Sequence, residues 1–62
     1  MRFKDFLEMF DDWNAIVVVN NDNLECIARD QGMRIYENHK ELFNQEVVSF
    51  GFYDNELCIR IK

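Results

Sequence analysis

Hydrophobic residues near the N-terminus follow the spacing of a helix. Apolar side chains stand at positions i, i+3, i+4 and i+7: Phe3, Phe6, Leu7 and Phe10. This spacing places them on one face of an α-helix, and charged residues between them supply a solvated opposite face. We expect the helix to end near Trp13-Asn14, because acidic residues at 11 and 12 oppose the dipole of a helix C-terminus.

The next part of the chain predicts two strands joined by a turn. Residues 15–19 are apolar and β-branched, which is typical of a central strand. Residues 20–23 contain only Asn and Asp, which favour turns because they tolerate positive φ. Residues 24–29 then return as a second strand, and we expect Val19 to lie opposite Leu24.

The C-terminal third predicts a hairpin. Strands at residues 46–53 and 56–62 flank Asp54-Asn55, a pair typical of a two-residue turn. The expected pairs that share one apolar face are Phe52 with Leu57, Phe50 with Ile59 and Val48 with Ile61. Before this hairpin, residues 33–36 predict a short third strand, and residues 37–45 are either one helical turn or a long loop.

Together these elements predict one α+β domain over residues 1–62, an amphipathic N-terminal helix packed on an antiparallel sheet of four to five strands. A domain of this size buries only about 60% of its unfolded surface, so oligomerisation would stabilise it. The strand at 56–62 is expected at a sheet edge that pairs with another copy. The expected homo-oligomer interface is a strip of small and polar residues on the opposite face of the hairpin: Ser49, Gly51, Cys58, Arg60 and Lys62.

Charge narrows the range of partners. Twelve acidic residues against seven basic ones give a net charge of −5, which disfavours direct DNA binding and favours a partner with a basic surface. The sequence has neither the run of about 20 apolar residues of a membrane helix nor a signal peptide, so we expect a cytoplasmic protein without membrane contact. Cys26 and Cys58 are then expected to be reduced, buried hydrophobes.

Candidate chemistry centres on acidic residues at the end of the predicted helix. Glu8, Asp11 and Asp12 are spaced so that they could hold Mg²⁺ for phosphoryl chemistry, although a solvated helix end has the same pattern. A second acidic set at Asp54 and Glu56 would have to converge on the first to build a two-metal site. No other metal or cofactor is expected, and His39 has no nucleophile beside it in the sequence.

A resemblance bears on function. The stretch Val47–Ile59, together with Phe3-Lys4-Asp5-Phe6 and Trp13-Asn14, resembles short proteins from phages and mobile elements of gut Firmicutes. Their size, acidity and setting are similar to those of small anti-defence proteins, including anti-CRISPR inhibitors. One anti-CRISPR group of this size is an oligomeric β-sheet protein that alters plasmid topology and thereby impairs Cas9. The resemblance implies a small protein that acts against a host defence system.

Three hypotheses for function follow from these observations. The first is a non-enzymatic inhibitor that binds a basic host defence effector, with these contact residues: Asp5, Glu8, Asp11, Asp12 and Tyr53. The second is metal-assisted nicking or relaxation of supercoiled plasmid DNA, with Glu8, Asp11 and Asp12 as catalytic Mg²⁺ ligands. The third is a structural or regulatory oligomer without catalysis.

Overall fold

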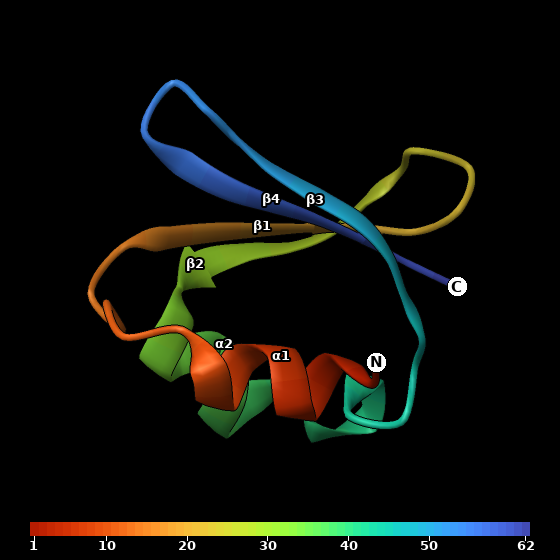
Figure 1. Cartoon of the computed structure of the whole chain (residues 1–62), viewed down its shortest axis with the longest axis horizontal. Coiled ribbons are helices and arrows are strands. Elements are labelled where there is room, and N and C mark those ends of the chain that lie inside the picture. Colours follow the sequence, from red (N-terminus) through yellow and green to blue (C-terminus); the bar gives the residue numbers. More distant parts are fainter.

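Two hairpins form a single sheet, and the helices lie together on one side of it (Figure 1). The structure is a computed structural model that describes all 62 residues. Its elements are α1 (Phe3–Met9), β1 (Ile16–Asn20), β2 (Cys26–Gln31), α2 (Gly32–Asn38), the 3₁₀ helix η1 (Lys40–Leu42), β3 (Val47–Tyr53) and β4 (Glu56–Ile61). The predicted α+β fold, with the N-terminal helix packed on the sheet, is confirmed.

The order of the strands in the sheet is β2-β1-β4-β3. Both hairpin pairs are antiparallel, but β1 and β4 run parallel, with Val17 opposite Leu57 and Val19 opposite Ile59. The sheet is therefore mixed instead of wholly antiparallel. The prediction that the last strand lies at an edge is wrong, because β4 supplies three nearly fully buried residues and is paired on both sides. The two edges are β2 and β3.

The β3–β4 hairpin has the predicted tip and much of the predicted register. Asp54 and Asn55 have φ values of 53° and 65°, as both central residues of a type I′ turn require. The expected pairs Phe50 with Ile59 and Phe52 with Leu57 are both present. An irregularity between Val47 and Ser49 then shifts the register, so that Val47 and not Val48 lies opposite Ile61.

The β1–β2 hairpin has a longer loop than the sequence suggested. The side chain of Asn21 accepts hydrogen bonds from the backbone N–H groups of Asn23 and Glu25, at 2.9 and 3.0 Å. These contacts stabilise a wide loop. Val19 consequently pairs with Ala28, and the expected pairing with Leu24 is wrong.

The helical elements also correct the sequence-based expectations. α1 ends at Met9, before the predicted end near Trp13-Asn14, and the chain becomes extended at Phe10. Residues 33–36 are not a strand, because they lie in α2, whose buried residues Gly32 and Ile35 are one helical turn apart. Residues 37–45 contain the single 3₁₀ turn η1, which was one of the two alternatives.

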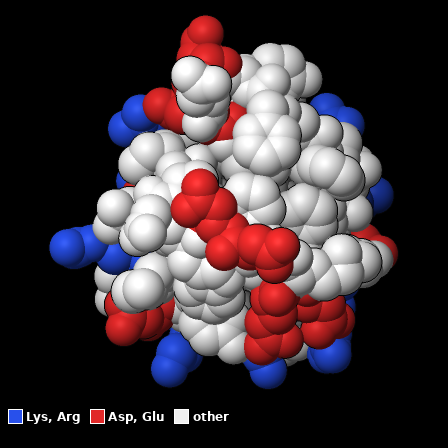
Figure 2. All heavy atoms as spheres, turned by 60° about the vertical axis from the view of Figure 1, so that its left-hand side comes forward, with Lys and Arg blue, Asp and Glu red and all other residues white.

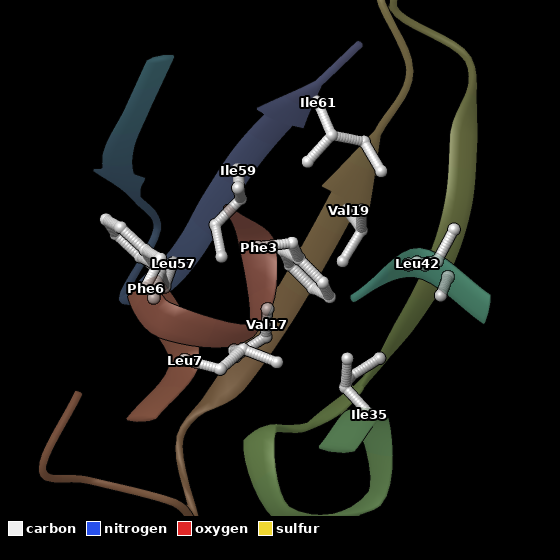
Figure 3. Close-up of a cluster of buried hydrophobic side chains, with 11 residues drawn as sticks. Phe3, Phe6, Leu7, Val17, Val19, Ile35, Leu42, Leu57, Ile59 and Ile61 are labelled. Atoms are coloured by element: carbon white, nitrogen blue, oxygen red, sulfur yellow. The ribbon is translucent and has the colours of Figure 1, made fainter. Parts of the chain in front are cut away.

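One hydrophobic core lies between the helices and one face of the sheet. Its residues are Phe3, Phe6, Leu7, Val17, Val19, Ala28, Ile35, Leu42, Leu57, Ile59 and Ile61. Figure 3 shows Phe3, which is fully buried, near the middle of this cluster. No helix covers the other face of the sheet (Figure 1).

Candidate functional site

Parallel pairing of β1 and β4 brings two distant acidic segments to the same end of the sheet. The α1–β1 loop precedes β1 and carries Asp11 and Asp12, while the β3–β4 turn precedes β4 and carries Asp54. Since Val17 lies opposite Leu57, the two strands begin side by side (Figure 1). An acidic loop and an acidic turn that are far apart in sequence therefore project from one end.

Ion pairs neutralise many of the other carboxylates. The pairs are Arg2–Asp5, Lys4–Glu8, Arg29–Glu56, Arg34–Asp30 and the Met1 amino group with Glu46, and Nδ1 of His39 lies 3.3 Å from the Glu41 carboxylate, which is an ion pair only when the imidazole is protonated. None of these pairs involves Asp11, Asp12 or Asp54. Asp12 accepts a hydrogen bond from the backbone N–H of Asn14 at 3.1 Å, which fixes the loop without neutralising its charge.

Tyr53 ends β3 and directly precedes Asp54 at the same end of the sheet. Its side chain is 67% exposed, and its ring lies against Gly51, with Cε2 3.1 Å from where a Cβ of that glycine would be. We call Asp11, Asp12, Tyr53 and Asp54 the acidic end. Figure 2, which turns this side of the molecule toward the viewer, shows acidic atoms at the top, through the middle and near the lower edge, and basic atoms mostly at the margin.

Asp5 and Glu8, two of the predicted contact residues, are engaged within the chain. The Nε of Arg2 lies 3.4 Å from the Asp5 carboxylate. Glu8 accepts a hydrogen bond of 2.6 Å from the Tyr36 hydroxyl and so links α1 to α2. This hydrogen bond is the main reason that the pKa of Tyr36 is raised above its ordinary value. Of the predicted contact residues, those without an ion pair or a hydrogen bond to another side chain are thus Asp11, Asp12 and Tyr53.

The acidic residues do not converge as a metal site. No group of three or more His, Cys, Asp or Glu side chains is placed so that it could hold a metal ion. Glu8 is directed to Tyr36 and Lys4. The Mg²⁺ ligand set that the nicking hypothesis requires is therefore not formed by Glu8, Asp11 and Asp12.

The strip predicted as an oligomer interface lies on the uncovered face of the sheet. Ser49 pairs with Arg60 and Gly51 with Cys58, so these four residues are neighbours. They line a shallow hollow of about 240 Å³. The Nε of Arg60 is buried there without a hydrogen-bond partner. Lys62 follows β4, and its backbone N–H donates to the carbonyl oxygen of Glu46 at 2.9 Å.

The two cysteines differ in their surroundings. Cys26 is exposed, so the expectation that it is buried is wrong, while Cys58 is half-buried. Burial, followed by the nearby carboxylates of Glu56 and Asp54, raises the pKa of the Cys58 thiol. Both cysteines are free thiols.

Two features of the surface were missed from the sequence. Asp54 was considered only as a possible metal ligand, and its link to Asp11 and Asp12 depends on the parallel strand pair. Phe50 and Phe52 were expected on the apolar face of the hairpin that would form the floor of the core, and they pair with Ile59 and Leu57 as expected, but each is 61% exposed. On the helix side Phe50 meets the ring of Phe6 at 4.8 Å and Phe52 that of Phe10 at 6.0 Å between ring centroids, and no pattern in the sequence indicates that both remain exposed.

Comparisons of the chain with protein-family models, curated proteins and solved structures found no match. Neither α1 nor α2, each of seven residues, is long and apolar enough to cross a membrane. The acidic end is thus the surface feature from which a function is to be inferred.

Proposed function

We propose that this chain is a non-catalytic inhibitor that uses its acidic end to occupy a basic surface of a host defence effector. The observation that carries this proposal is the placement of Asp11, Asp12 and Asp54, none of which has an ion-pair partner, at one end of the sheet, where the exposed Tyr53 directly precedes Asp54. A second protein that supplies Lys and Arg would provide the missing countercharges.

Electrostatic complementarity of this kind accelerates association and selects among partners. Aromatic residues such as tyrosine are enriched where an interface concentrates its binding energy, so Tyr53 is a suitable anchor beside the charges. Because exposed charges are screened by salt, binding should weaken as the ionic strength rises.

The resemblance to anti-defence proteins supports an effector that handles nucleic acid. Cas9 holds its RNA–DNA duplex in a positively charged channel, which a compact group of carboxylates can enter in place of phosphates. Such an effector acts in the bacterial cytoplasm, and we propose that location for this protein. If the chain inhibits no effector, the alternative function is that of a structural or regulatory oligomer.

The test is cleavage of a supercoiled plasmid by a Cas9–guide complex with and without the purified chain, read on an agarose gel. We expect the chain to slow cleavage and Asp11→Asn/Asp54→Asn to weaken the inhibition about tenfold, the effect of losing two exposed charge contacts. Asn suits position 54 because it tolerates the positive φ there. The matched control is Asp22→Asn/Glu25→Gln, which removes equal charge from the opposite end of the sheet and should inhibit like the unmodified chain.

Two outcomes would contradict the proposal. Uninhibited cleavage would remove the inhibitor hypothesis, and equal losses in both double variants would show that net charge, not the acidic end, is recognised. A plasmid lane with Mg²⁺ but without Cas9 tests the nicking alternative. Nicking there that is lost in Asp11→Ala/Asp12→Ala would replace inhibition by binding with metal-assisted cleavage.

A further inference from the structure

The outer side of β3 is an open hydrogen-bonding edge from Phe50 onward, while at its start the N–H of Val47 donates to the carbonyl oxygen of Met1 at 2.8 Å. In an antiparallel pair closed by a two-residue turn, the residues flanking the turn bond to each other and every second residue behind them also faces the partner strand. Tyr53, Gly51 and Ser49 therefore face β4. The N–H and C=O groups of Phe50 and Phe52 point the other way, where the sheet has no further strand.

This edge lacks the features that usually prevent pairing between sheets. Natural edge strands carry lysines, prolines or bulges, or are very short. β3 has seven residues and neither a charged residue nor a proline, and its one irregularity lies at its start, before Ser49. The opposite edge, β2, carries Arg29 and Asp30. The two edges therefore differ, and only β3 presents an uncharged strand.

Exposed hydrophobic side chains lie along the same edge on the helix-bearing side. The Phe50 ring packs 4.8 Å from that of Phe6, yet Phe50 and Phe52 each remain 61% exposed. Phe50 and Val48 border a hollow of about 480 Å³, whose wall on the helix side includes Met9. A row of apolar groups thus continues from α1 to the free edge of the sheet.

The exposed area suits a small interface. Five exposed apolar side chains make up the row: Met1, Met9, Val48, Phe50 and Phe52. At about 100 Å² each they offer about 500 Å², a large patch for a monomer with 4157 Å² of accessible surface. With the strand backbone added, each copy would bury about 600–800 Å², which is what stable interfaces of modest size require.

We propose that β3 pairs antiparallel with β3 of a second copy, about a two-fold axis at Gly51, to form a continuous eight-stranded sheet. The segment Phe50-Gly51-Phe52 reads the same in both directions. The axis therefore places Phe50 opposite Phe52 of the second copy, in both halves, with their outward N–H and C=O groups bonded to each other. Gly51 of one copy lies opposite Gly51 of the other at a closely spaced pair of the ladder. The lack of a side chain there allows the two strands to approach each other.

The charges are compatible with this arrangement. No charged residue lies in β3, so pairing sets no like charges directly opposite each other despite the net charge of −5. Because the strands are antiparallel, the two Asp54 turns lie at opposite ends of the joined sheet. The axis at Gly51 places Tyr53 opposite Ser49 of the second copy, so the acidic end borders the dimer interface, while Asp11 and Asp12 lie outside β3. The inference rests on the edge of β3 and does not depend on the proposed function.

The experiment is sedimentation of the full 62-residue chain at concentrations up to about 0.5 mM, where a dissociation constant of about 0.1 mM or lower gives mostly dimer. We expect twice the monomer mass of 7.5 kDa. Phe52→Lys should return the chain to 7.5 kDa, because it sets a cation into each half of the interface. Ile27→Lys, at an exposed apolar position of the other edge, is the control and should stay dimeric. Circular dichroism spectra establish that both variants are folded.

A second variant tests the register. Gly51→Cys is made in a Cys26→Ser/Cys58→Ser/Tyr53→Ala background, because the Tyr53 ring would lie 3.1 Å from the added Cβ. It should form an intermolecular disulfide under mild oxidation, since residues at such a position have Cα atoms about 4.5 Å apart. Ile27→Cys in the same background should not. A monomeric unmodified chain, or a dimer that Phe52→Lys leaves intact, would overturn the proposal. Absence of the Gly51→Cys cross-link in a dimer would overturn the two-fold axis at this glycine.

Discussion

Removing a single methylene group from the middle of the core should have a measurable effect on stability. Ile59 is fully buried in β4, between Val19 of β1 and Phe50 of β3. Ile59→Val removes one carbon and leaves a small cavity, for which we expect a loss of about 1 kcal/mol. A chain of 62 residues has a total stability of about 3–9 kcal/mol, so this loss is a substantial fraction. The expected decrease in Tm is about 4–8 °C.

The same change at Ile27 is the matched control, because this side chain is 41% exposed on β2. Ile27→Val should cost less than about 0.5 kcal/mol. Both variants would be unfolded in urea at one protein concentration, followed by circular dichroism. Equal losses at the two positions, or a larger loss at Ile27, would refute the arrangement of the core in which β4 is the central strand.

Three further predictions concern local contacts. Gly32→Ala should leave the stability unchanged or raise it by up to about 1 kcal/mol, measured by thermal unfolding. The added Cβ would meet the backbone oxygen of Trp13 at 3.5 Å and a methyl group of Val17 at 3.6 Å, which are ordinary contacts. A clear loss of stability would contradict this prediction. The hydrogen bond to Glu8 raises the pKa of Tyr36, so its stabilising contribution is complete below the unfolded pKa of about 10 and is lost as pH rises through the raised value. A spectrophotometric titration should therefore lose its late component in Tyr36→Phe, and an unchanged curve would disagree. Iodoacetamide should modify exposed Cys26 before Cys58, whose pKa is raised mainly by burial, and the difference should vanish in urea.

The parts of the fold that depend on local rules could be predicted from the sequence. The turn at Asp54-Asn55 sets the register of its own hairpin. The pairs of Phe50 with Ile59 and of Phe52 with Leu57 therefore follow from the turn. The apolar stripe that begins at Phe3 likewise defines a helix by its own periodicity. A short apolar stretch such as residues 33–36 is ambiguous between strand and helix, and here the burial of Ile35 against the sheet decides for the helix.

The parts that depend on contacts between distant segments could not. Nothing in residues 15–19 or 56–62 specifies that these strands run side by side and parallel, which made the last strand central and the sheet mixed. The candidate site likewise depends on a contact between distant segments. Asp11 and Asp12 were recognised as an acidic pair, but Asp54 joins them only through that parallel pairing.

The most direct test of the central claim is the affinity of the chain for a Cas9–guide complex, measured for three proteins at low and at high salt. The account predicts salt-sensitive binding by the unmodified chain and by Asp22→Asn/Glu25→Gln, and about tenfold weaker binding by Asp11→Asn/Asp54→Asn. Absence of binding, or equal affinities for the two double variants, would contradict the claim that the acidic end recognises the effector.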